Sequence, residues 1–253
     1  MKLFKNALIY DGTGAEAFKG DILVDNDRIV KVENSIQTED GWEVIDLEGL
    51  SISPGFIDAH SHNDWFAIKN QPQKYFEPFI RQGITSFVTG NCGLSAVGFE
   101  ADSQYADKVG GGLFSYTDTT GVYPRVSDFF DAVDRNSPCN IAVLAGHCTA
   151  RASVAGYENR PLTDAERKKM LDIMENALKE GACGLSLGLM YEPGIYAGID
   201  ELKDVARLCE KYDRPMTVHP RACSAVSMTY PLLGRPHLLR ALDELVDIAS
   251  GTT

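Results

Sequence analysis

The sequence lacks any basic segment and any long apolar run. Its 24 Lys and Arg are scattered and are outnumbered by 36 Asp and Glu, which gives a formal net charge of −12. A surface of this sign repels polyanions, so we expect neither a nucleic-acid partner nor contact with an anionic membrane surface. No apolar stretch approaches the roughly 20 residues that span a bilayer, so no membrane partner is expected.

The chain also lacks CxxC pairs and an apolar signal-peptide core. The six cysteines are spread along the sequence, which favours a reducing compartment over a disulfide framework. We interpret Cys139, Cys183 and Cys209 as small buried apolar residues. The first residues, MKLFKNALIYDGTG, do not resemble a cleavable leader. Together these absences predict a cytoplasmic location.

Two patterns of secondary structure are present, with a change near residue 54. Residues 1–53 alternate apolar and polar positions between turn residues, which predicts strands at 3–10, 21–24, 28–32 and 43–46. From residue 54 onward, short apolar strands alternate with helices, as in an α/β barrel. The expected strands are 57–60, 86–89, 140–145, 183–187 and 215–219, and the expected helices are 163–180, 200–211 and 237–250. Residues 90–125 are expected to form a loop above the barrel mouth.

The number of barrel strands is too small for a closed barrel. A complete (β/α) barrel has eight strands in typically ~250 residues, whereas residues 54–253 supply about five. Five parallel strands leave two edges with unpaired backbone groups. The predicted fold class is therefore α/β, a partial TIM-type barrel. The remaining strands come either from a second polypeptide, which we favour, or from a part lost by truncation.

The segment PGFIDAHSHND, residues 54–64, places His60 and His62 at the end of an apolar strand. Positions i and i+2 of a strand face the same side, so both imidazoles can enter one pocket. Imidazole is a common zinc ligand. A pair of ordinary surface or core histidines is the alternative, but the apolar run before them and the acidic residue after them favour a metallohydrolase strand.

These residues and four further motifs resemble the amidohydrolase superfamily, and within it the D-aminoacylases (N-acyl-D-amino-acid deacylases). The further motifs are VTGNCG at 88–93, GHCTAR at 146–151, GLSLGLMYEPG at 184–194 and VHPR at 218–221. The resemblance extends along the whole chain, in order, and corresponds to the N-terminal half of the family. It implies that residues 1–53 form part of a β-sandwich, which residues from the far C-terminus complete.

The resemblance also implies a metal site and its chemistry. Cys92 and His219 would hold one tight Zn²⁺, and His60 with His62 a possible weaker second site. A further histidine and the acid/base aspartate would lie beyond residue 253, so no catalytic residue is assigned within the chain. The implied reaction is hydrolysis of a small-molecule amide, in which zinc activates water and a carboxylate transfers protons.

Two residues are candidates for substrate binding. Arg151 can pair with a substrate carboxylate, with a solvated loop arginine as the alternative, and Tyr191 matches a tyrosine in the family's substrate pocket. His147 is expected to have a packing role, and His237 a structural one. Ala222-Cys223-Ser224 replaces the usual Asn-Glu pair after Arg221, which puts the D-amino-acid specificity in doubt.

Two other functions remain open from the sequence. The first is a cyclic amidase of the hydantoinase or dihydroorotase type. Such enzymes usually carry a carboxylated lysine on the fourth strand, and residues 183–187 contain no lysine. The second is a non-catalytic partner or scaffold that has kept the fold.

Overall fold

The computed structural model describes residues 1–110, 112–250 and 252. The chain divides into two compact units, Met1–Phe56 and Ile57–Thr253. Among the described residues, none of the helices is both long enough and apolar enough to cross a membrane.

The first unit is one five-stranded sheet. Its strands are β1 (Lys2–Ile9), β2 (Phe18–Asp25), β3 (Arg28–Glu33), β4 (Glu43–Asp46) and β5 (Ser51–Ile52). The order is β3-β2-β1-β4, and β5 also pairs with β1. The short β5 was not expected, because two residues carry no alternation pattern. A sandwich needs a second sheet packed on this one, whereas the described residues of the first unit form a single sheet, so the β-sandwich stays a prediction.

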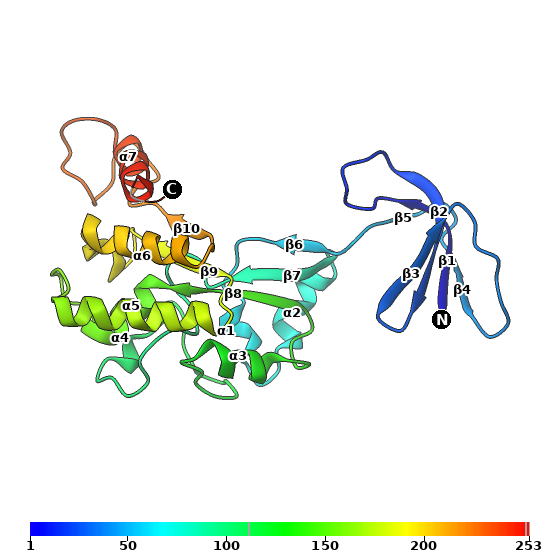
Figure 1. The fold of residues 1–253 in the computed structure, drawn as a ribbon, viewed down its shortest axis with the longest axis horizontal. Helices are drawn as coiled ribbons and strands as arrows, with labels where there is room; N and C mark the ends of the chain where they lie inside the picture. Colours follow the sequence, from blue (N-terminus) through cyan, green and yellow to red (C-terminus); the bar gives the residue numbers. More distant parts are fainter. Residues whose placement is uncertain (111, 251, 253) are drawn as a thin grey trace. The chain divides into compact units, whose positions relative to one another are not determined.

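The second sheet is parallel and forms a curled half-barrel (Figure 1). It runs β10-β9-β8-β7-β6. The strands are β6 (Phe56–Asp58), β7 (Ile84–Thr89), β8 (Asn140–Gly146), β9 (Gly184–Gly188) and β10 (Met216–His219). All five lie where the apolar runs predict them, although β6 ends two residues before the expected His60.

Helices surround this sheet in the usual order of α/β units (Figure 1). They are α1 (Asp64–Ala67), α2 (Gln73–Ile80), α3 (Val126–Val133), α4 (His147–Ala155), α5 (Asp164–Lys179), α6 (Ile199–Lys211) and α7 (His237–Ala249), with 3₁₀ turns η1 (Ala106–Lys108) and η2 (Gly194–Tyr196). Helix α2 packs on β7, α5 on β8 and β9, and α6 on β9. Apolar residues of these elements, including Val143, Leu185 and Met174, form one core.

Burial across the half-barrel differs sharply between its centre and its edges. Every residue of β9 is buried, whereas all four residues of β10 are only partly buried. On β6, Phe56 is 59% and Ile57 69% exposed. Exposed apolar side chains on a strand of a parallel sheet are unusual, because parallel sheets are normally covered on both faces. The two edge strands therefore have the character of interior strands that lack neighbours.

The capping box of α5 is the clearest local test of the fold. Thr163 Oγ1 accepts a hydrogen bond from the Glu166 N–H at 3.3 Å, and the Glu166 carboxylate accepts one from the Thr163 N–H at 2.8 Å. We expect Thr163→Ala to lower the free energy of unfolding by about 1 kcal/mol, because the first turn loses its side-chain acceptor. Chemical denaturation measures this. Thr163→Ser keeps the acceptor, and a loss equal to that of Ala would contradict the capping role.

The Arg160 guanidinium and the Thr163 bonds together hold the pKa of the Glu166 carboxyl at about 2. A folded pKa below the unfolded value of 4.5 gives stability that is complete above pH 4.5 and is lost as the pH falls towards 2. We therefore expect the stability difference between the wild type and Glu166→Gln to shrink over that pH window. Denaturation curves at several pH values measure it, and a pH-independent difference would show that charge is not the cause.

Candidate metal centre

The two histidines of the HSH segment follow β6 directly. Because β6 ends at Asp58, both His60 and His62 lie in the loop after the strand, whereas the expected strand 57–60 included His60. The His60 N–H donates to the Asp58 carboxylate at 3.0 Å, which fixes the turn. The two imidazole rings still lie side by side, with centroids 6.1 Å apart. Loop geometry, not strand alternation, therefore brings the two rings together.

Cys92 lies in a tight loop after β7 with an unusual backbone. Its φ is +57°, a left-handed conformation that is uncommon for a side chain with a Cβ. The loop is packed against β9 and β8: a Cβ at Gly188 would lie 1.9 Å from the Cys92 carbonyl oxygen, and one at Gly146 would lie 2.3 Å from that of Gly93. Glycine at both strand positions is therefore what permits this loop to approach the sheet.

The Cys92 sulfur lies between two histidines that come from opposite edges of the sheet. Its Sγ is 3.4 Å from His60 Nε2 and 3.6 Å from His219 Nδ1. A tetrahedral zinc with ordinary Zn–S and Zn–N bonds holds such atoms about 3.6 Å apart. The ligand atoms of His60, His62 and Cys92 also lie within 4.8 Å of one another. The two distances from the Cys92 sulfur fit ligands of one zinc ion, and His62 lies close to them.

The protonation of these groups also suits a metal. Burial lowers the pKa of His62, and His60 lowers it further; the pKa of His219 is lowered by the same two causes. Burial raises the pKa of the Cys92 thiol. Metals bind neutral imidazole and thiolate, so the two histidines are close to their binding form and Cys92 must release a proton. His62 Nδ1 is buried without a hydrogen-bond partner among the described residues.

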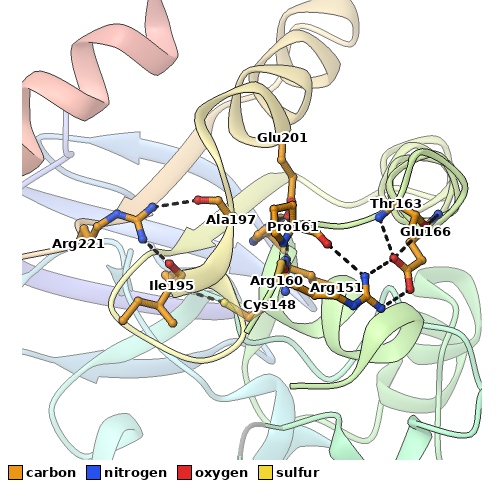
Figure 2. A network of polar contacts seen from close by, with 12 residues as sticks. Cys148, Arg151, Arg160, Pro161, Thr163, Glu166, Ile195, Ala197, Glu201 and Arg221 are labelled. Carbon is orange, nitrogen blue, oxygen red and sulfur yellow. Dashed lines mark hydrogen bonds and ion pairs between the residues drawn. The ribbon is translucent and has the colours of Figure 1, made fainter. Parts of the chain in front are cut away.

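Tyr191 lies beside this cluster. Its hydroxyl is 3.5 Å from His219 Nδ1, and the two ring centroids are 4.7 Å apart. The loop from β9 to α6 that carries Tyr191 is held by Arg221, whose guanidinium donates to the carbonyls of Ile195 and Ala197 at 2.6 and 3.3 Å (Figure 2). Tyr191 therefore contacts the same histidine that lies beside the Cys92 sulfur.

Arg151 does not join the cluster. It is fully buried in α4, where its Nε donates to Glu201 at 2.9 Å and its Nη2 to the Arg160 carbonyl at 2.8 Å (Figure 2). The solvated-loop interpretation is wrong, because this arginine is helical and has no exposed surface. The ion pair with Glu201 competes with any substrate carboxylate, so the binding role of Arg151 stays a prediction.

His147 has a buried partner that the sequence does not reveal. Its Nε2 lies 2.8 Å from the Glu201 carboxylate, which Arg151 shares. Burial alone would raise the pKa of Glu201, but the hydrogen bond and charge of His147, together with Arg151, hold that pKa below its usual value. The three residues join α4 to the first turn of α6, consistent with the packing role expected for His147.

Sequence reasoning missed the residues that support the cluster. Asn91 and Ser186 are both fully buried, and their side chains bond to the backbone around the candidate ligands. Ser186 is a polar residue inside a buried apolar strand, which is a usable signal, since buried polar groups need partners. Asn91 gives no such signal, because an asparagine next to a glycine is also typical of an ordinary turn.

A parallel half-barrel with imidazole and thiol groups at the carboxyl ends of its strands is typical of metal-dependent barrel hydrolases. The profile described as "Amidohydrolase family" matches residues 43–222. The chain belongs to this family.

Three relatives refine the comparison. An N-acyl-D-aspartate deacylase of Alcaligenes xylosoxydans xylosoxydans is 35% identical over 81% of this chain and 40% of its own length. A D-aminoacylase structure described as having a binuclear metal centre matches 99% of this chain and 49% of its own, with a TM-score of 0.79 and 29% identity. An N-acyl-D-glutamate deacylase of Bordetella bronchiseptica, solved with zinc and a phosphonate inhibitor, has a TM-score of 0.77, 28% identity and the same coverage. The chain thus spans about half the length of these relatives.

Because β9 and the Cys92 loop are in such close contact, a single methyl group added at Gly188 should strongly destabilise the fold. Gly188→Ala places a Cβ 1.9 Å from the Cys92 carbonyl oxygen, so we expect a loss of about 3 kcal/mol in the free energy of unfolding. Gly198→Ala is the control, because a Cβ there meets nothing within 4 Å. Denaturation curves of both variants measure the difference, and equal losses would mean that the loop does not require glycine at 188.

Proposed function

We propose that this chain is the metal-binding part of a zinc-dependent amidohydrolase that cleaves the amide bond of an N-acyl-D-amino acid or a related compound. The observation that carries the proposal is the Cys92 sulfur, which lies 3.4 Å from His60 Nε2 and 3.6 Å from His219 Nδ1. The family match and the deacylase relatives support the same reaction class.

His60, His62, Cys92 and His219 would hold the metal. We propose that Cys92 and His219 contribute to one tight site and that His60 and His62 form a weaker second one. When bound, zinc lowers the pKa of a water molecule and polarises a carbonyl. The Tyr191 hydroxyl, next to His219, would hydrogen-bond the amide substrate and orient it towards the metal.

The acid/base group is proposed to lie outside this chain. Two carboxylates adjacent in sequence to the histidines already have hydrogen-bond partners: the Asp58 carboxylate accepts from the His60 N–H, and the Asp64 carboxylate accepts from Thr89 and Ala96. The exposed apolar residues of β6 and the partly buried β10 are consistent with further strands pairing there. We propose that these strands and the acid/base aspartate come from a second polypeptide.

A cytoplasmic location is part of the proposal. All six cysteines lie in the described part of the chain and are free thiols, as expected in a reducing compartment. A thiolate metal ligand also benefits from such a compartment, since oxidation of Cys92 would remove its ability to bind zinc.

The assay uses the protein as isolated, with any chain that co-purifies. We expect release of free amino acid from N-acetyl-D-amino acids and not from their L-enantiomers, loss of activity on chelation and recovery on addition of zinc. Equal hydrolysis of both enantiomers would contradict the D-specific reaction. Hydrolysis of a hydantoin or dihydroorotate, with no hydrolysis of N-acetyl-D-amino acids, would support the cyclic-amidase alternative.

Cysteine variants test the metal centre within the same assay. Cys92→Ala should lose bound zinc and fall to background activity, because the sulfur between the two histidines is gone. Cys183→Ala is the matched control, since this partly buried thiol lies just before β9 and away from the cluster. Zinc content by elemental analysis and initial rates report both effects. Unchanged zinc in Cys92→Ala would remove the proposed site.

A further inference from the structure

The loop that carries Cys92 is held at both ends by one hydroxyl group from β9. Ser186 Oγ donates to the Gly90 carbonyl at 2.5 Å and accepts from the Gly93 N–H at 3.0 Å. These two backbone groups flank the turn that contains Cys92. Ser186 is fully buried, so no water competes for either bond. The hydroxyl therefore fixes the turn at a set distance from β9.

A second buried side chain joins the same turn to the two neighbouring ligand-bearing segments. Asn91 Nδ2 donates to the Ser61 carbonyl at 3.4 Å, and Ser61 lies between His60 and His62. On the other side, Asn91 Oδ1 accepts from Thr217 Oγ1 at 3.2 Å. Thr217 lies on β10, which ends at His219. One amide thus connects the three segments that carry all four candidate ligands.

We infer that Ser186 and Asn91 are positioning residues of the metal centre. They are called here the Cys92 support. Neither side chain touches the metal in this proposal; each sets where Cys92 Sγ lies relative to His60 and His219. The left-handed φ of Cys92 is unfavourable for this residue, so the turn needs external bonds to keep it. The inference rests on the proposed zinc site and assigns a role within it.

Zinc affinity tests the inference without reference to catalysis. Ser186→Ala removes both bonds and leaves every candidate ligand in place. Loss of a residue that orients a metal ligand commonly weakens metal binding about 10- to 100-fold. We expect a loss in this range, because Ser186 bonds the backbone of Gly90 and Gly93 on either side of Cys92. Competition with a chromophoric chelator measures the dissociation constant. With Co²⁺ in place of zinc, the thiolate-to-metal absorption band should shift or weaken, because the Cys92 sulfur is displaced.

The chain offers a closely matched control. Ser153 is also fully buried; its hydroxyl donates to the Ala150 carbonyl at 2.8 Å and accepts from the Glu100 N–H at 3.1 Å. Ser153→Ala therefore removes the same group and the same number of bonds, away from Cys92. We expect a comparable loss of metal-free stability but an unchanged zinc constant and cobalt spectrum. Equal weakening of zinc binding in both variants would reduce Ser186 to a general structural role and overturn the inference.

Thr217→Val provides a second test should Ser186→Ala fail to fold. It removes the hydroxyl that bonds Asn91 Oδ1 and keeps nearly the same shape. Weaker zinc binding in this variant is the result that the positioning role predicts. Unchanged zinc binding would overturn the inference. The outcomes also separate the two proposals: a wild-type protein that binds no zinc contradicts the metal centre itself, whereas zinc binding that tolerates Ser186→Ala and Thr217→Val contradicts only the positioning roles.

Discussion

The Cys92 turn approaches β8 and β9 so closely that neither strand could carry a side chain at the point of contact, and the candidate site depends on this approach. The carbonyls of Cys92 and Gly93 occupy the space that a Cβ would fill at Gly188 and Gly146. A sheet with side chains at those two positions would push the turn outward. The sulfur would then leave its place between His60 and His219. The absence of a Cβ at Gly146 and Gly188 thus determines where the Cys92 sulfur can lie.

The curvature of the sheet is the second requirement of the site. His60 follows β6 and His219 ends β10, which are the opposite edges of the sheet. In a flat sheet, four strand spacings of about 4.8 Å would separate these edges by roughly 19 Å. Both imidazoles nevertheless contact the same sulfur, at 3.4 and 3.6 Å. The half-barrel is therefore already curled as tightly as a site inside a closed barrel requires.

Local pattern predicted the strands of the half-barrel and three of the seven helices among the described residues, and it predicted the side-chain partners poorly. The strand positions, helix α5 and its Thr163–Glu166 cap follow from apolar periodicity and capping chemistry, both of which act over a few residues. Helix α4 was missed because almost all of its residues are buried. It therefore has no exposed polar face, and its sequence lacks the alternation of apolar and polar positions that marks a surface helix. Arg151 was misread as a possible loop residue for the same reason. Its partner Glu201 lies 50 positions away, and no local pattern encodes such a pair.

The open edges and the metal centre are physically coupled. His60 follows β6, which has exposed apolar residues, and His219 ends β10, whose residues are all partly buried, so any strands that close the barrel would pack directly beside those ligands. Edge strands fluctuate more than central ones because fewer hydrogen bonds hold them. Cys92, by contrast, is bound through Ser186 to β9, which has a neighbouring strand on each side. The best-held ligand of the site is therefore the one attached to an interior strand, and the positions of His60 and His219 are the ones that strands added at the edges would affect.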